Sequence, residues 1–119
     1  MATRFLQVDA FTDRPFSGNP AAVCFLEAPA NEVWMQRVAA EMNLAETAVV
    51  VPVDRAGGRY SLRWFTPAVE VDLCGHATLA SAHALWSDGR ASPESRLRFD
   101  TRSGELTAER RGDLVRLDF

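Results

Sequence analysis

The stretch that decides the fold is "GHATLASAHALW", Gly75–Trp86, a predicted helix whose small and apolar side chains point in almost every direction. Only Thr78, Ser81 and His83 are left to face anything polar. A helix that is apolar all round is a buried helix. In a chain of 119 residues, a curved sheet is the only element that can enclose it. We therefore predict an α+β fold, in which a strongly curled, mostly antiparallel and barrel-like sheet wraps around this central helix.

The flanking sequence supplies the strands of that sheet. Seven β-rich segments separated by turn residues predict strands with mostly hairpin connections. They cover Arg4–Phe11, Ala21–Glu27, Thr47–Val53, Arg59–Phe65, Arg96–Thr101, Glu105–Arg110 and Leu114–Phe119. The strand Thr47–Val53 is apolar enough to be covered on both faces. A second helix is predicted over Asn31–Asn43, with Asn31 as its N-cap. Its apolar stripe comprises Val33, Trp34, Val38 and Met42.

Composition and charge exclude several classes of protein. The chain carries a net charge of -3, and its 13 cationic residues are scattered arginines rather than the cluster of a nucleic-acid binder. No apolar stretch approaches the roughly 20 residues of a membrane span, and the first residues lack a signal peptide's apolar core. Two cysteines make no disulfide framework. We expect a cytoplasmic protein without nucleic-acid or membrane partners.

The chain ends within a predicted strand, Leu114–Phe119, and no turn or polar tail follows it. We expect residues 1–119 to form a single domain. The abrupt end favours a piece of a longer protein over a domain that finishes with its last strand.

Topology predicts that the reactive side chains meet. The strands Thr47–Val53 and Arg59–Phe65 are arms of equal length around one turn. The connection after the second arm therefore returns to the Glu46 end of the sheet. We predict that Glu46, Cys74 and His76 share that end, although they are distant in the sequence.

The start of the buried helix has the chemistry of an anion site. The first turn of a helix leaves N–H groups unpaired and carries partial positive charge. Gly75, His76 and Ala77 would offer their amides to a carboxylate. The alternative is that Gly75 only makes the turn and that Cys74 only closes the core.

Two residues are candidate proton carriers or nucleophiles. Glu46 lies at the edge of an apolar wall, where a raised pKa suits a general acid/base, or it is a solvated residue just past a helix. Cys74 is either a thiol activated by the helix end with His76 as its base, or a buried small hydrophobe. Residues two apart at a helix start do not readily face each other, which disfavours that thiol–imidazole pair. Cys24 is expected in the core.

No metal or phosphate site is predicted. His76 and His83 are separated by about 10 Å along a helix, and Cys-x-His alone is not a zinc spacing. Glycine-rich phosphate loops and dinucleotide fingerprints are missing from the sequence. We expect His83 to be a helix residue with a satisfied partner.

Four segments in series resemble the phenazine-biosynthesis PhzF-like isomerase family, which is related in fold to diaminopimelate epimerase. They are "VDAFTDRPFSGNPAAV", "MNLAETAVV", "RWFTPAVEVDLCGHATLASAHAL" and "FDTRSGELTAER". The resemblance implies a cofactor-independent isomerase or epimerase built from two similar halves, each a sheet around a central helix. The active site would lie between the halves. This chain resembles the N-terminal half only, and the second half is absent from it.

The resemblance also assigns site residues. The catalytic glutamate of the family's "NL-[AS]-E" motif corresponds to Glu46, and the active-site histidine of its "GH" motif corresponds to His76. The asparagine of "GNP", here Asn19, is similar to a residue that lines the substrate cleft. Gly75 and Ala77 match positions beside the substrate carboxylate.

Cys74 departs from the phenazine enzyme, which has another residue before "GH", whereas the related epimerase uses a cysteine there as its acid/base. Either Glu46 or Cys74 therefore carries the proton, and we favour Glu46. The expected activity is isomerisation of a small carboxylate by proton abstraction and reprotonation, in a homodimer. The alternatives are a half-domain that dimerises or binds a small acid without catalysis, and a thiol enzyme that uses Cys74.

Overall fold

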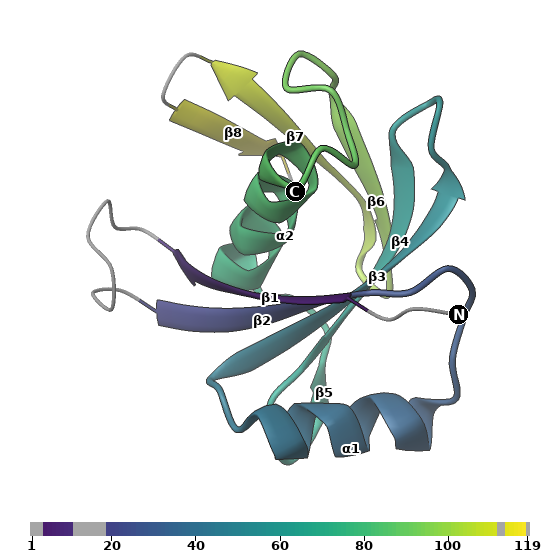
Figure 1. Cartoon of the computed structure of the whole chain (residues 1–119), viewed down its shortest axis with the longest axis vertical. Coiled ribbons are helices and arrows are strands. Elements are labelled where there is room, and N and C mark those ends of the chain that lie inside the picture. Colours follow the sequence, from purple (N-terminus) through teal and green to yellow (C-terminus); the bar gives the residue numbers. More distant parts are fainter. Residues whose placement is uncertain (1–3, 11–18, 112–113, 119) are drawn as a thin grey trace.

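One sheet runs through most of the chain and curls around helix α2 (Figure 1). The computed structural model describes residues 4–10, 19–111 and 114–118. The elements are β1 (Arg4–Ala10), β2 (Asn19–Phe25), α1 (Glu32–Met42), β3 (Glu46–Asp54), β4 (Arg59–Phe65), β5 (Glu70–Val71), α2 (Gly75–Ser87), β6 (Leu97–Thr101), β7 (Gly104–Arg111) and β8 (Leu114–Asp118). Phe11 and Phe119, the last residues of two predicted strands, lie outside the described residues.

The sheet is mostly antiparallel, as predicted. Its strands follow the order β1-β2-β3-β4-β6-β7-β8, and the short β5, which the sequence did not reveal, pairs with β4. Two pairs, β2–β3 and β4–β6, are parallel. Each of these pairs is joined by a connection that contains a helix, because a parallel neighbour is reached only by a crossover. Neither helix in the described ranges is long and apolar enough to cross a membrane.

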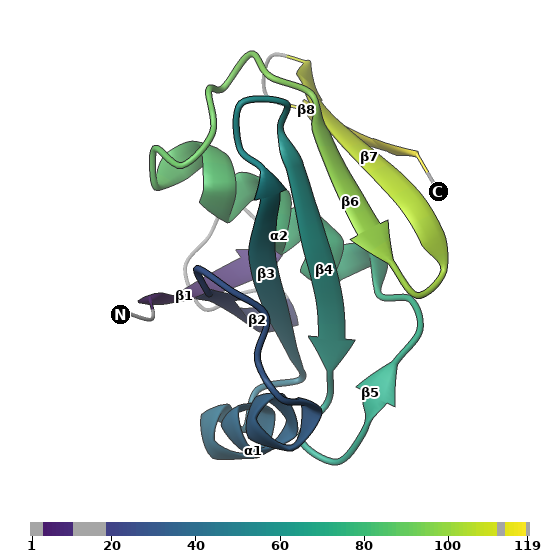
Figure 2. The same ribbon diagram turned by 90° about the vertical axis from the view of Figure 1, so that its right-hand side faces the viewer.

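Helix α2 occupies the hollow of the curled sheet (Figures 1 and 2). Its fully buried alanines let the strands approach closely. Thr78 and Ser81 are buried too, because their hydroxyls donate to the helix's own carbonyls four residues earlier, at 2.8 Å and 2.7 Å. Leu79 is half-buried and His83 is exposed, so they mark the one side of α2 that the described strands leave uncovered.

Strand β3 is covered on both faces, as its apolar sequence predicted. Ala48 and Val50 pack into the core around α2, and Val49 and Val51 pack into a second core beneath α1. A strand that is buried on both sides needs no polar alternation. This places the first residue of β3, Glu46, next to apolar surface on both faces of the strand.

Helix α1 begins as predicted but presents a different face. The Asn31 side chain caps it by accepting a hydrogen bond from the Val33 N–H at 2.7 Å. Its buried residues are Met35 and Ala39, one helical turn apart, whereas Val33 and Trp34 of the predicted stripe are exposed. The face of α1 that packs on the sheet is thus rotated by one residue, about 100°, from the predicted apolar stripe.

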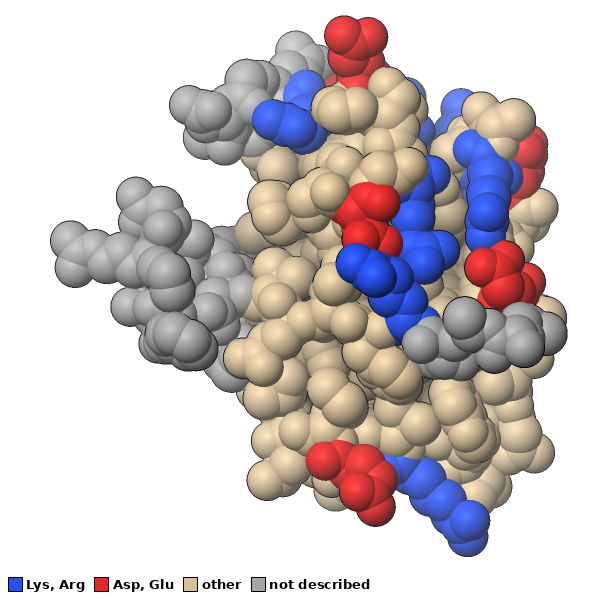
Figure 3. Space-filling model, in the orientation of Figure 1, with Lys and Arg blue, Asp and Glu red and all other residues tan. Residues whose placement is uncertain are grey.

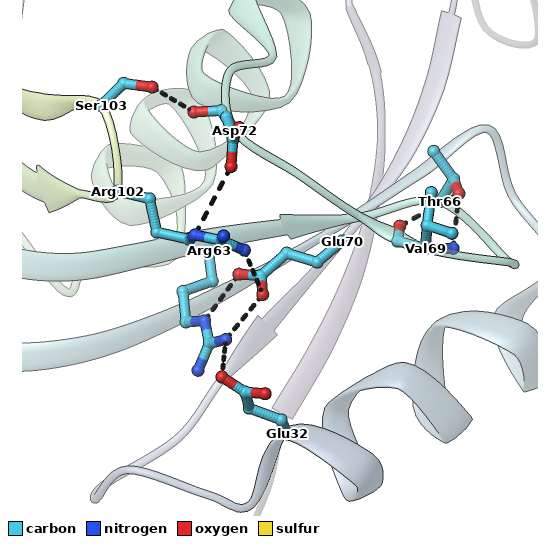
Figure 4. A network of polar contacts seen from close by, with 8 residues as sticks. All are labelled: Glu32, Arg63, Thr66, Val69, Glu70, Asp72, Arg102 and Ser103. Carbon is cyan, nitrogen blue, oxygen red and sulfur yellow. Dashed lines mark hydrogen bonds and ion pairs between the residues drawn. The ribbon is translucent and has the colours of Figure 1, made fainter.

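An ion-pair network ties the segment before α2 to the sheet (Figure 4). The Arg63 guanidinium on β4 donates two hydrogen bonds to the Glu70 carboxylate on β5, both at 2.7 Å, and one to Glu32. Arg102 also contacts Glu70, at 2.9 Å. The Asp72 carbonyl accepts a hydrogen bond from the Ser103 hydroxyl. The segment just before α2 is thus bonded to β4 through Arg63 and to the turn between β6 and β7 through Arg102 and Ser103.

Truncating the core side of α2 is expected to be costly. Leu85→Ala should lower the free energy of unfolding by about 2–5 kcal/mol, because it leaves a cavity under a fully buried side chain. Leu79→Ala on the half-buried side is the matched control and should cost less than half as much. Denaturant unfolding measures both free energies. Equal losses of unfolding free energy in the two variants would show that Leu79 and Leu85 are buried to the same extent, contrary to the structure.

Removing the central acid of the network should also destabilise the fold. The Glu70 side chain is 12% exposed and Glu32 is 74% exposed, so Glu70→Gln should cost about 1.5–3 kcal/mol and Glu32→Gln almost nothing. Hydrogen bonds from Arg63 lower the pKa of Glu70 below its ordinary 4.5. Its contribution is therefore complete above pH 4.5 and is lost as the pH falls through the lowered value. Between pH 3 and 6, the melting temperature of Glu70→Gln should depend less on pH than that of the unchanged protein. An identical pH dependence of the two melting temperatures would refute this role.

Candidate functional site

Three reactive side chains converge where β3 and α2 begin. Glu46 is the first residue of β3, Cys74 is the N-cap of α2, and His76 is in the first turn of α2. One carboxylate oxygen, the thiol sulfur and one imidazole nitrogen all lie within 4.8 Å of one another. The β3–β4 hairpin pairs Thr47 with Phe65, so the chain does return to the Glu46 end. The predicted juxtaposition of the three residues is confirmed.

Glu46 is placed between water and the core. Its neighbour in the register on β2 is the fully buried Ala21, and the next residue on β3, Thr47, is also fully buried. The Oε2 atom is buried, and the described residues offer it no hydrogen-bond partner. Burial raises the pKa of this carboxyl above its ordinary value, against smaller opposing effects of His76 and Cys74. A carboxyl in this position holds its proton at a higher pH than an exposed glutamate does.

Cys74 and His76 do face each other, contrary to our expectation. The Cys74 Sγ atom lies 3.5 Å from the His76 Nδ1 atom. The spacing rule for helices fails here because Cys74 is outside the helix, in extended conformation with φ -148° and ψ 105°. Its side chain can therefore turn back over the first helical turn, which two residues inside a helix cannot do.

The Cys74 thiol is not activated by its position. Burial raises its pKa, the N–H of Ala77 lowers it, and the Glu46 carboxylate raises it further. A helix N-terminus commonly lowers a thiol pKa, but here burial and the neighbouring carboxylate outweigh that effect. The thiol is thus protonated at neutral pH, which disfavours the hypothesis of a Cys74 nucleophile.

The first turn of α2 offers N–H groups at the same place. The first intrahelical bond runs from the Thr78 N–H to the Cys74 carbonyl at 3.1 Å. The N–H groups of Gly75, His76 and Ala77 precede it and have no intrahelical acceptor. They carry the partial positive charge of the helix end, next to Glu46. The predicted contact of these amides with a carboxylate stays a prediction.

Of the remaining candidates, Cys24 and His83 lie apart from this cluster, and only the backbone of Asn19 is described. Asn19 begins β2, two residues before Ala21, and β2 runs parallel to β3. Its backbone therefore lies at the same end of the sheet as Glu46. The Asn19 side chain lies outside the described residues, and its contact with substrate stays a prediction. Cys24 is fully buried in the core beneath α1, as expected, and burial raises its pKa to about 11. His83 is an exposed helix residue.

Sequence reasoning missed the network that supports the site. Nothing in the sequence around Arg63 pointed to its pairing with Glu70. The one available signal was the alternation of "VEVD" before Cys74, which is typical of a strand. The charged side chains on the face shown in Figure 3 mix both signs and form no single basic patch.

The comparisons with known proteins agree with the resemblance. A family model described as "Phenazine biosynthesis-like protein" matches residues 8–116. An uncharacterised isomerase of Halalkalibacterium halodurans is 56% identical over all of this chain and 44% of its own length. A crystal structure of a PhzF-family phenazine biosynthesis protein from Enterococcus faecalis matches with a TM-score of 0.88 and 44% identity, over 97% of this chain and 43% of that one.

A more distant likeness concerns the fold alone. The hydroxyproline epimerase of Agrobacterium vitis, solved with bound trans-4-hydroxy-L-proline, matches 95% of this chain and 40% of its own with a TM-score of 0.68 at 13% identity. This supports the predicted epimerase-type fold of a sheet curled around a helix. The chain spans less than half the length of the curated relatives it matches.

Alkylation should reveal the coupling between Glu46 and Cys74. Because the Glu46 carboxylate raises the pKa of the Cys74 thiol, Glu46→Gln should speed the reaction of Cys74 with iodoacetamide at pH 7.5. Peptide mass spectrometry over time gives the rate, with the buried Cys24 as internal reference. Glu41→Gln, on the exposed side of α1, is the matched control and should leave the rate unchanged. A slower reaction in Glu46→Gln would contradict the coupling.

Proposed function

The chain belongs to the phenazine biosynthesis-like protein family, and on that premise we propose that the protein which carries it is a cofactor-independent isomerase of a small carboxylate. The observation that supports this best is a half-buried glutamate with a raised pKa beside the first turn of a buried helix. The reaction would move a proton between two positions of a substrate that is held by its carboxylate.

The N–H groups of Gly75, His76 and Ala77 would bind the substrate carboxylate. Helix-end amides favour anions, and they stabilise most strongly the additional negative charge that develops on the carboxylate when a neighbouring carbon loses its proton. Burial of most of the helix sides leaves its ends and the exposed His83 as the polar features that a ligand could reach. We place Asn19 at the rim of the same site, because its backbone lies at that end of the sheet.

Glu46 would carry the proton. Its carboxylate takes the proton from the carbon next to the substrate carboxylate, and the electron pair of the broken C–H bond spreads into the substrate's conjugated system. The protonated Glu46 then returns the proton at the new position, so that no net proton is gained or lost. A raised pKa suits both steps, because it strengthens the base and still allows the acid to release its proton. His76 lowers the Glu46 pKa and so limits the rise that burial produces, which helps the protonated Glu46 to release its proton in the second step.

Glu46 is a better candidate than Cys74 for the abstracting base. A thiol that is protonated at neutral pH must first lose its own proton, which its burial and the Glu46 carboxylate both oppose. Cys74 is then a neighbour that donates toward Glu46 and closes the apolar side of the site. The substrate, the homodimer and the cytoplasmic location stay predictions for the complete protein.

Solvent hydrogen exchange tests this mechanism without knowledge of the product. The complete protein in D2O, mixed with a panel of small amino acids and unsaturated acids, should exchange a C–H hydrogen of at least one of them, as proton NMR detects. Glu46→Gln should lower that exchange rate by about 100-fold or more while leaving the circular dichroism unchanged. Glu41→Gln is the control and should keep full activity.

Three outcomes would contradict the proposal. Undiminished exchange in Glu46→Gln would remove Glu46 from the mechanism. If Cys74→Ala lost more activity than Glu46→Gln, the thiol would be the proton carrier instead. Binding of a panel acid without any exchange would favour a non-catalytic binding domain.

A further inference from the structure

We propose that Glu46, Cys74 and His76 also form a binding site for a zinc-type divalent cation, and that the bound cation blocks proton transfer. The three side chains supply the oxygen, sulfur and nitrogen donors that Zn²⁺ accepts in proteins. They come from two elements, β3 and α2, that the curled sheet holds together. Binding of the cation does not depend on the isomerase activity, whereas its inhibitory effect does rest on the proposed function.

The geometry fits a tetrahedral ion. With a Zn–S distance of about 2.3 Å and a Zn–N distance of about 2.0 Å, the sulfur and nitrogen ligands of a tetrahedral zinc are about 3.5 Å apart. The Cys74 Sγ to His76 Nδ1 distance is 3.5 Å. A Glu46 carboxylate oxygen lies within 4.8 Å of the sulfur and of one imidazole nitrogen. A movement of that oxygen by up to about 1.4 Å would bring it to the third corner of the tetrahedron. The fourth corner would take a water molecule.

The charges also balance. When the cation binds, the Cys74 thiol releases its proton to the solvent. The resulting thiolate and the Glu46 carboxylate together supply two negative charges, which neutralise one divalent cation when the imidazole is neutral. The positive end of α2 opposes the cation but stabilises the thiolate that binds it. The buried Oε2 of Glu46, which has no hydrogen-bond partner among the described residues, gains one strong interaction when the carboxylate turns to the metal.

The donor set selects the kind of metal. A thiolate and an imidazole suit Zn²⁺ and Co²⁺, whereas Mg²⁺ and Ca²⁺ require oxygen ligands throughout. The sequence pattern Cys-x-His did not predict a metal site, because the third ligand is contributed by Glu46 from a distant segment. The sequence also does not reveal the extended conformation of Cys74, which turns its sulfur toward the His76 imidazole.

Cobalt titration of the complete protein tests the site directly. Co²⁺ bound through a thiolate in tetrahedral geometry gives intense visible bands and a sulfur-to-cobalt charge-transfer band. We expect both in the unchanged protein, and we expect one equivalent of Zn²⁺ to bleach them. Cys74→Ala should lose the charge-transfer band. Glu46→Gln and His76→Gln should weaken Co²⁺ binding by at least about tenfold, which is the lower limit for residues that merely support a metal ligand.

Matched controls come from the same chain. His83→Gln changes the other histidine of α2, and Glu41→Gln changes an exposed acid of α1, and both should bind Co²⁺ as before. Circular dichroism of each variant separates a lost ligand from a lost fold. A protein without tetrahedral bands, or bands that persist in Glu46→Gln and His76→Gln, would overturn the site.

A second readout separates the two proposals. Zn²⁺ should stop the exchange of substrate hydrogen in D2O, and a chelator should restore it. Zn²⁺ binding without any effect on exchange would overturn the inhibitory role while leaving the metal site intact. Cobalt bands in a protein that exchanges no acid of the panel would support the metal site and count against the isomerase.

Discussion

The burial of helix α2 inside the curled sheet is the constraint on which the rest of the structure depends. Its small side chains admit the strands on most sides, and its buried hydroxyls are satisfied by its own carbonyls. A helix enclosed in this way can offer a ligand little except its ends and the uncovered row that contains Leu79 and His83. The candidate site therefore lies at the N-terminus of α2, where the helix end carries partial positive charge and the chain arrives from the ion-pair network.

The same burial sets the chemistry of Glu46. The residue begins a strand, β3, that is covered by α2 on one face and by α1 on the other. That apolar wall stabilises the fold, and it also removes water from the carboxyl group and raises its pKa. Cys74 experiences the same loss of water, so its thiol stays protonated despite the helix end. The core and the site are thus two consequences of one packing arrangement.

The sequence predicted those parts of the fold that depend on apolar pattern and chain length. The buried helix, the doubly covered β3 and the return of the chain to Glu46 all follow from such patterns. Features that depend on particular backbone angles or on long side chains were not predictable. The contact of Cys74 with His76 requires the extended N-cap, and the pairing of Arg63 with Glu70 joins flexible side chains from separate strands.

The Cys74 side chain distinguishes the two proposed binding events, because the cation requires it and the carboxylate does not. The N–H groups of α2 favour a carboxylate whatever side chain stands at position 74, because the backbone supplies them. A divalent cation, in contrast, needs both the thiolate and the Glu46 carboxylate to offset the positive helix end. A neutral side chain at position 74 would leave the proposed carboxylate site and the proton carrier in place and would remove one of the two negative ligands. On these two proposals, the cysteine adds a response to metal ions to a site whose proton transfer does not require it.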